Sequence, residues 1–239
     1  MPSIIANSND NTAYAIAGTW AGVRDATGGN VSSFWASTGT LSLANRVMYH
    51  SGRGNYFLHR WFMWFDTSGI TSTPSSANIS LTVTGAGSGD SIIIKSTAFG
   101  GDGLSALATG DYDAFPGFST GASMSGNVTD YSNNVTNNAA NPLVYTLNSD
   151  ALSDMTSNNY LIVCVVNYSF DYLNVSSGLP STNSHDLGIR TADYSTASER
   201  PTLNYTTAGY SNDIIGVASA NVGRVKGITS AAITKIIGV

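Results

Sequence analysis

Short runs of alternating apolar and polar residues, separated by turn residues, recur along most of this chain. The stretch 77–84 alternates strictly, which places Ile79, Leu81 and Val83 on one buried face of a strand. Residues 59–65 form the most apolar early run and are predicted to be a central strand. Further strands are predicted at 91–96, 143–147, 160–168, 187–191 and 202–206. Strands of this length and spacing are typical of a β-sandwich.

Two stretches depart from the alternation. Residues 98–141 are rich in Gly, Asp, Ser and Asn and show weak periodicity, and connections of that length without structure are uncommon unless they are functional. Residues 149–155 are predicted to form a short helix, with Ser149 as the N-cap residue and Asp154 in the turn that follows. We expect no other helix before the C-terminal tail.

The tail carries an eleven-residue repeat. Gly216, Gly227 and Gly238 are spaced eleven residues apart, and most positions between them repeat in kind. Internal repeats of this fidelity are rarely accidental. The sequence therefore predicts a sandwich domain over 1–209 and an assembly or attachment tail over 210–239.

Glycine in every copy and many β-branched residues argue against one continuous helix in the tail. Each copy is predicted to combine a short helical turn, capped by Ser219 or Ser230, with an extended step. Such a unit cannot bury its apolar face alone, so it is expected to pack on copies from neighbouring chains or on a docking surface. The assembly residues would be Ile214, Val217, Val222, Val225, Ile228, Ile233 and Ile236. A flexible terminus is the alternative interpretation.

The composition narrows the class of protein. Only 10% of residues are charged, against roughly 25% in ordinary globular domains, so Ser, Thr, Asn and Gly must supply the polar surface. The net charge of −5 argues against nucleic acid as a partner. No apolar run approaches the ~18 residues of a membrane span, and the N-terminus lacks the segments of a secretion signal.

Two parts of the chain resemble known families. Residues 60–70 and 77–83 resemble the start of a DNRLRE-type jelly-roll module, in which an Arg-led strand ends in Phe-Asp and a turn leads to an Ala-x-Leu-x-Leu strand. Residues 200–205 resemble the closing strand of that family. The resemblance implies an all-β jelly-roll sandwich of a carbohydrate-binding-like kind, found on cell-surface and phage proteins. The tail resembles the Ile-x-Gly-Val-Ala-x-Ala repeats that end many phage virion proteins.

Candidate catalytic residues are few, and we expect no enzyme. The three histidines, His50, His59 and His185, are too far apart in sequence to suggest a metal pair, and the common catalytic motifs are absent. Ser184, His185 and Asp186 suggest a triad fragment, but neighbours in a strand point to opposite faces. Cys164 lies in an apolar run and is predicted to be a buried core residue.

Acidic residues in glycine-rich turns form the one candidate metal site. Asp102, Asp111 and Asp113 offer the hard oxygen ligands that Ca²⁺ prefers. Their spacing fits no EF-hand loop, so ordinary turn aspartates are the alternative. Asp113 also lies between Tyr112 and Phe115, the only hint of the apolar setting that a glycosidase acid needs. No other cofactor is expected.

The tryptophans are the candidate glycan-binding residues. Exposed aromatic rings stack on sugars, whereas core packing is their more frequent role. Trp61 and Trp64 have an odd spacing, which places them on opposite faces of one strand. Arg60 is predicted to hold the end of that strand together with Asp66. The full candidate set is Trp20, Trp35, Trp61 and Trp64.

Together these observations predict a non-catalytic structural protein on the surface of a bacteriophage virion, either a capsid decoration or a component of a tail or fibre. Its expected partners are copies of itself, with a trimer favoured, other virion proteins and host-surface glycans. The alternative is a carbohydrate-binding module or receptor-binding adhesin that recognises surface glycans. A glycan-cleaving enzyme is the third interpretation, and it would depend on Asp111 or Asp113.

Overall fold

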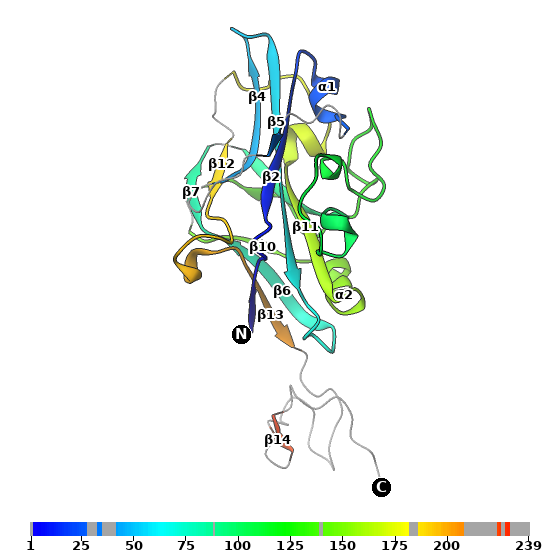
Figure 1. The fold of residues 1–239 in the computed structure, drawn as a ribbon, viewed down its shortest axis with the longest axis vertical. Coiled ribbons are helices and arrows are strands. Elements are labelled where there is room, and N and C mark those ends of the chain that lie inside the picture. The colour runs from blue at the N-terminus through cyan, green and yellow to red at the C-terminus, as the bar shows by residue number, and fades with distance from the viewer. Residues whose placement is uncertain are drawn as a thin grey trace.

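The protein is an all-β sandwich of two antiparallel sheets, with an irregular layer over the outer face of the larger sheet (Figure 1). The computed structural model describes residues 2–27, 33–34, 42–87, 89–138, 141–181, 186–207, 224–225 and 228–229. The predicted fold class, an all-β sandwich, is confirmed.

The smaller sheet has four strands in the order β1-β13-β6-β10. Leu203 of β13 and Tyr145 of β10 both pair with Ile79 of β6, so their side chains share one face and pack against the larger sheet. The positions of β6 and β13 that alternate with them are Ser, Thr and Asn and face outward, whereas β10 exposes Val144 and Thr146 on that face. The strands are β1 (Ser3–Ile5), β6 (Pro74–Leu81), β10 (Leu143–Thr146) and β13 (Thr202–Thr207).

The larger sheet is organised around β5, which pairs with β2, β4 and β11. β5 is also the longest strand of the described chain and carries the apolar run 59–65 that predicts a central strand. The strands of this sheet are β2 (Asn11–Ala17), β3 (Ser33–Phe34), β4 (Ser42–His50), β5 (Asn55–Asp66), β7 (Val83–Ala86), β8 (Asp90–Lys95), β9 (Val135–Thr136), β11 (Tyr160–Asn167) and β12 (Leu187–Ile189).

The stretch 77–84 is not one strand but two. β6 ends at Leu81 in the smaller sheet, and β7 begins at Val83 in the larger sheet, so the chain crosses between sheets around Thr82. Ile79 and Leu81 are buried and Val83 packs against the same core, as the alternation predicts. The apolar face is therefore continuous although the hydrogen bonding changes sheet.

The strands of the larger sheet bury both of their faces. Trp61, Met63 and Phe65 of β5 point into the core between the sheets, together with Ile79 and Leu203 of the smaller sheet. The alternate positions of the larger sheet point into a second core on its outer face. Burial on both faces explains why β5 and β11 are nearly continuous apolar runs.

Residues 98–128 cover this outer face of the larger sheet, and we call them the outer layer. Phe99, Tyr112, Phe115 and Met124 pack there against apolar side chains of the sheet, among them Cys164. The layer has little regular structure beyond the 3₁₀ turns η2 (Phe99–Gly101) and η3 (Thr109–Asp111). Cys164 is fully buried, as predicted.

The prediction of a single helix was wrong in two respects. Helix α2 (Ser149–Ser157) begins one residue after Asn148, whose side chain accepts hydrogen bonds from the amides of Asp150 and Ala151, so Asn148 and not Ser149 is the N-cap. Asp154 lies inside this helix and binds Lys95 at 2.7 Å. The unpredicted helical elements are α1 (Trp20–Arg24), the π-helical turn η4 (Tyr168–Tyr172) and the 3₁₀ turn η5 (Ala197–Glu199).

Two short strands lie in the repeat tail. β14 (Arg224–Val225) pairs antiparallel with β15 (Ile228–Thr229), which sets Val225 opposite Ile228. The other predicted assembly residues, Ile214, Val217, Val222, Ile233 and Ile236, and the capping serines 219 and 230, lie outside the described residues. No helix in the described part of the chain is long and apolar enough to cross a membrane.

Candidate functional site

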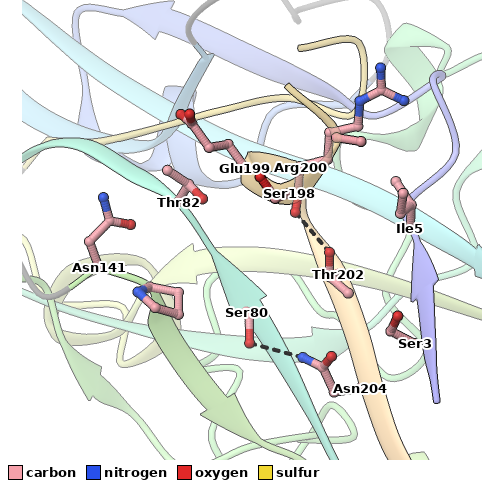
Figure 2. Close-up of a pocket in the computed structure, with 12 residues that line it drawn as sticks. Ser3, Ile5, Ser80, Thr82, Asn141, Ser198, Glu199, Arg200, Thr202 and Asn204 are labelled. Carbon is pink, nitrogen blue, oxygen red and sulfur yellow. Dashed lines mark hydrogen bonds between the residues drawn. The ribbon is translucent and has the colours of Figure 1, made fainter. Parts of the chain in front are cut away.

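An open cleft of about 820 Å³ lies on the outer face of the smaller sheet (Figure 2). Strands β1, β6 and β13 form its floor, and the segment before β13 forms one rim. The lining residues are Ser3, Ile5, Ser80, Thr82, Asn141, Pro142, Ala197, Ser198, Glu199, Arg200, Thr202 and Asn204. The cleft is therefore lined mainly by hydroxyl and amide groups.

The floor of the cleft is held by a small network of side chains. Asn204 Nδ2 donates hydrogen bonds to Asn78 Oδ1 and to Ser80 Oγ, each at 3.1 Å. Ser80 Oγ in turn donates to Asn78 Oδ1 at 3.2 Å. Figure 2 shows Ser80 and Asn204 facing each other across neighbouring strands. The network fixes these polar groups before any ligand arrives, which lowers the entropic cost of binding.

The rim segment, residues 191–200, of which residues 197–200 line the cleft, is folded on itself by its charged side chains. Arg200 Nε donates to the carbonyl of Tyr194 at 2.6 Å. Arg190 Nε lies 3.3 Å from Glu199 Oε2, and the Arg190 guanidinium lies 4.0 Å from the centre of the Tyr194 ring. These contacts connect both ends of the segment to its middle, at Tyr194.

The chemistry of the cleft suits binding better than catalysis. Among its lining residues Glu199 supplies the one carboxylate, whereas glycoside hydrolysis needs a pair of carboxyl groups. Ser, Thr and Asn side chains both donate and accept hydrogen bonds, as a polyhydroxylated ligand requires. Ile5 is 42% exposed and gives the floor one apolar contact.

A second cluster of functional groups is sealed inside the protein. Arg60 donates to both carboxylate oxygens of Asp171, from Nε at 2.8 Å and from Nη2 at 2.7 Å. Its remaining donors reach the carbonyl of Tyr112 and the carbonyl of Arg24, both at 2.9 Å. Arg60 and Asp171 are fully buried. Burial alone would lower the pKa of Arg60, but Asp171 reverses this effect, so the pKa lies above its ordinary value.

This cluster overturns the predicted role of Arg60. The side chain does not hold the strand end with Asp66, because it points into the second core toward Asp171 of η4. Asp66 is exposed, and its pKa is lowered by hydrogen bonds from the Ser68 side chain and from the Ser68 amide, the latter at 3.0 Å. The spacing in sequence suggested a local pair, whereas the real partner lies 111 residues away.

Arg24 extends the cluster to α1 and the outer layer. Its Nη1 donates to Asp25 Oδ1 at 2.7 Å and to the carbonyl of Ser119 at 3.4 Å, and its Nε lies 3.7 Å from Asp171 Oδ1. The guanidinium also stacks 4.7 Å from the centre of the Phe118 ring. The cluster therefore fastens α1, η4 and the outer layer to β5.

The three candidate metal ligands shape turns in the outer layer. Asp111 Oδ2 accepts hydrogen bonds from the amides of Ala108 at 2.8 Å and Phe99 at 3.2 Å. Asp102 Oδ1 accepts from the amide of Leu104 at 2.9 Å. Asp113 is half-buried. In the described part of the chain, no group of three or more His, Cys, Asp or Glu residues is placed to hold a metal ion.

The tryptophans do not form a common binding face. Trp61 is fully buried between the sheets, so it cannot stack on a ligand, while Trp64 packs against the second core. Their opposite orientation agrees with the prediction. Trp20 is half-buried and donates from Nε1 to Asn174 Oδ1 at 2.9 Å. Trp35 lies outside the described residues, and none of the other three tryptophans lines the cleft.

Two of the weak catalytic candidates, His59 and Asp186, have structural roles. His59 is buried and stacked 4.9 Å from the Tyr14 ring, and burial lowers its pKa to about 3, so it is neutral. Asp186 accepts hydrogen bonds from Arg46, from Nη2 at 2.5 Å and from Nε at 2.9 Å. His185, its neighbour, lies outside the described residues.

The sequence holds one signal for the cleft that the search for catalytic motifs passed over. The outward positions of the strands at 77–84 and 202–206 are all Ser, Thr or Asn, and they alternate with buried apolar positions. Such a face is an ordinary solvated surface unless a rim closes it, and the rim comes from residues 197–200. No family model matches this chain, and no curated protein matches it in sequence.

Proposed function

We propose that this protein is a non-catalytic structural module on the surface of a bacteriophage virion, a capsid decoration or a tail or fibre component. The observation that carries the proposal is the eleven-residue repeat of the tail. Its apolar positions recur with the repeat, and units of this size become stable only by stacking on further copies. Homo-oligomers, with a trimer favoured, are the assembly that this requires.

The burial of charged groups inside the sandwich supports the same proposal. The buried ionic cluster of Arg60, Asp171 and Arg24 is sealed from solvent, and the Arg60 guanidinium in it is held by four internal hydrogen bonds. Such a cluster holds layers together and leaves no group free to act on a substrate. The outer face of the smaller sheet is hydroxyl and amide in character, as suits a water-facing coat.

The test is the solution mass of the full chain, measured by light scattering beside two point variants of the tail. Ile228→Asp places a charge at a predicted assembly position, and Thr229→Asp adds the same charge at the neighbouring polar position. The full chain and Thr229→Asp are expected to form one defined oligomer, and Ile228→Asp a folded monomer. A full chain that remains a monomer at all concentrations would contradict assembly through the tail.

The cleft favours a second function, the recognition of surface glycans. Its floor offers preorganised donors and acceptors at Asn204 and Ser80, and its rim adds Arg200. Binding is tested on an array of bacterial surface polysaccharides with the full chain and with Asn204→Ala. The control is Thr146→Ala, an exposed position of β10 outside the cleft. Selective loss of binding in Asn204→Ala supports the glycan site, whereas equal binding by all three proteins excludes the cleft.

A further inference from the structure

The rim of the cleft is tied to the rest of the protein by a buried carboxyl group. Asp10 lies in the segment between β1 and β2, where the chain passes from the smaller to the larger sheet. Its Oδ2 accepts a hydrogen bond from the amide of Ala192, the second residue of the rim, at 3.0 Å. The segment is itself fixed, because the amide of Ala6 donates to the carbonyl of Pro201 and that of Asn7 to the carbonyl of Trp64.

The surroundings of Asp10 do not satisfy a negative charge. The residue is 7% exposed, and within the described chain its Oδ1 has no hydrogen-bond partner. The hydroxyl of Thr191, one residue before the bound amide, is also buried without a partner among those residues. Because Oδ1 lacks a donor, burial costs more for the carboxylate than for the neutral carboxyl group.

The charged groups of the rim oppose ionisation as well. Asp193, one residue beyond the bound amide, acts on Asp10 as a like charge. The cations of this region, Arg190 and Arg200, are engaged by Glu199 and by the carbonyl of Tyr194. Burial first, and Asp193 in addition, raise the pKa of Asp10 from 3.8 to about 7, although the bond from the Ala192 amide lowers it.

We propose that Asp10 and the Thr191–Ala192 step form a proton-dependent latch, which holds the rim segment 191–200 in its described position when Asp10 is protonated and releases the segment when Asp10 ionises. Opening the rim admits water to Oδ1, which relieves the buried charge and separates it from Asp193. The rim is thus held in its described position in acid and loosened toward neutral pH. The latch would regulate the cleft of the second proposed function, but it requires no ligand.

The difference in the pKa of Asp10 between the closed and the open rim determines how strongly rim opening depends on pH, and over which pH range. If Asp10 regains its ordinary pKa of 3.8 in the open rim and has a pKa of about 7 in the closed rim, the opening equilibrium rises over that interval. The rise is up to about tenfold per pH unit and levels off above the higher value. The group is protonated in both states at lower pH and ionised in both at higher pH, so the equilibrium is flat outside the window.

Hydrogen exchange followed by mass spectrometry on the full chain tests the latch. After correction for the intrinsic exchange rate, peptides covering 191–200 are expected to lose protection between pH 5 and 7 and then level off, while peptides of β11 show no such window. Asp10→Asn keeps an acceptor for the Ala192 amide but cannot titrate, so its rim is expected to give a flat profile. Asp193→Asn, which removes the like charge, is expected to shift the window to lower pH.

Two outcomes would overturn the latch. One is a rim whose pH profile is the same in the wild type and in Asp10→Asn. The other, which needs no variant, is an Asp10 carboxyl signal in the NMR spectrum of the wild type that titrates near pH 4. Neither outcome bears on assembly or glycan binding, so a failed latch leaves the proposed functions standing.

Discussion

The buried pair of Arg60 and Asp171 should be the most sensitive ionic contact in this protein. The change to make is Asp171→Asn, which keeps the size of the side chain but removes its charge. Asp171 receives two charge-assisted hydrogen bonds from Arg60, at 2.8 and 2.7 Å, and has Arg24 Nε at 3.7 Å. All three side chains are inaccessible to solvent, so the variant leaves two buried guanidinium groups without their shared counter-charge.

The size of the effect follows from that geometry. Hydrogen bonds to charged groups contribute about 1.5–3 kcal/mol each, and removing one partner of a buried ion pair costs about 3–5 kcal/mol. We expect Asp171→Asn to lower the free energy of unfolding by about 4 kcal/mol. The matched control is Asp186→Asn, because Asp186 and Arg46 form a bidentate pair whose side chains are 14% and 18% exposed. Because water screens this pair, Asp186→Asn should lower the free energy of unfolding by only about 1 kcal/mol.

Urea denaturation followed by tryptophan fluorescence measures both variants, at one fixed protein concentration because assembly would add to the apparent stability. A double variant, Arg60→Met with Asp171→Leu, is expected to be more stable than Asp171→Asn alone, since it leaves one fewer unpaired charge. If Asp171→Asn costs no more than Asp186→Asn, the cluster does not fasten the outer layer, and the reasoning fails.

Three further predictions concern other parts of the sandwich. Asp10→Asn is expected to raise the free energy of unfolding at pH 8 and to have little effect at pH 4. The sign follows because folding raises the pKa of Asp10 from 3.8 to about 7. The wild type therefore has its full stability below pH 3.8 and loses stability as the pH rises toward 7. Equal denaturation midpoints of the wild type and Asp10→Asn at pH 8 would contradict this prediction. Gly117→Ala should destabilise the outer layer by well over 1 kcal/mol, because the new Cβ would lie 1.9 Å from the carbonyl oxygen of Asn127. Gly126→Ala is the control: Gly126 has a similar positive φ but open space around it, so this variant should lose only about 1 kcal/mol. Thermal melts of both variants measure the difference. Cys164, whose burial raises its thiol pKa, should react with a thiol reagent only as the protein unfolds, and rapid labelling of the native protein would disprove its place in the core.

The sequence predicted the strands whose pattern is set by burial. β5, β6 and β11 could be predicted because each has at least one buried face, which shows in the sequence as a pattern of apolar residues. β2 and β4 escaped prediction, since β2 buries alanines and β4 mixes Asn, Arg and His with its apolar positions. Helix α1, with five residues, is too short to show a helical period.

The outer layer, the partner of Arg60 and the cleft could not be predicted, because they depend on contacts between residues far apart in the sequence. The outer layer is irregular in sequence because apolar anchors such as Phe99 and Phe115, not hydrogen-bonded strands, hold it to the sheet. The partner of Arg60 is brought near by the pairing of β5 with β11 and the turn η4. The cleft needs a rim from 197–200 above a floor from β1, β6 and β13, so it exists only after the sheet has formed.

Arg60 also determines which alignment of the central strand can fold. Side chains of a strand alternate between faces, so a slip of β5 by one residue would exchange its two faces. Trp61 and Phe65 would leave the core between the sheets, and Arg60 would enter it. There the guanidinium would have neither Asp171 nor water, a penalty of several kcal/mol. An apolar residue at this position would tolerate either alignment, whereas arginine disfavours pairings shifted by one residue during folding.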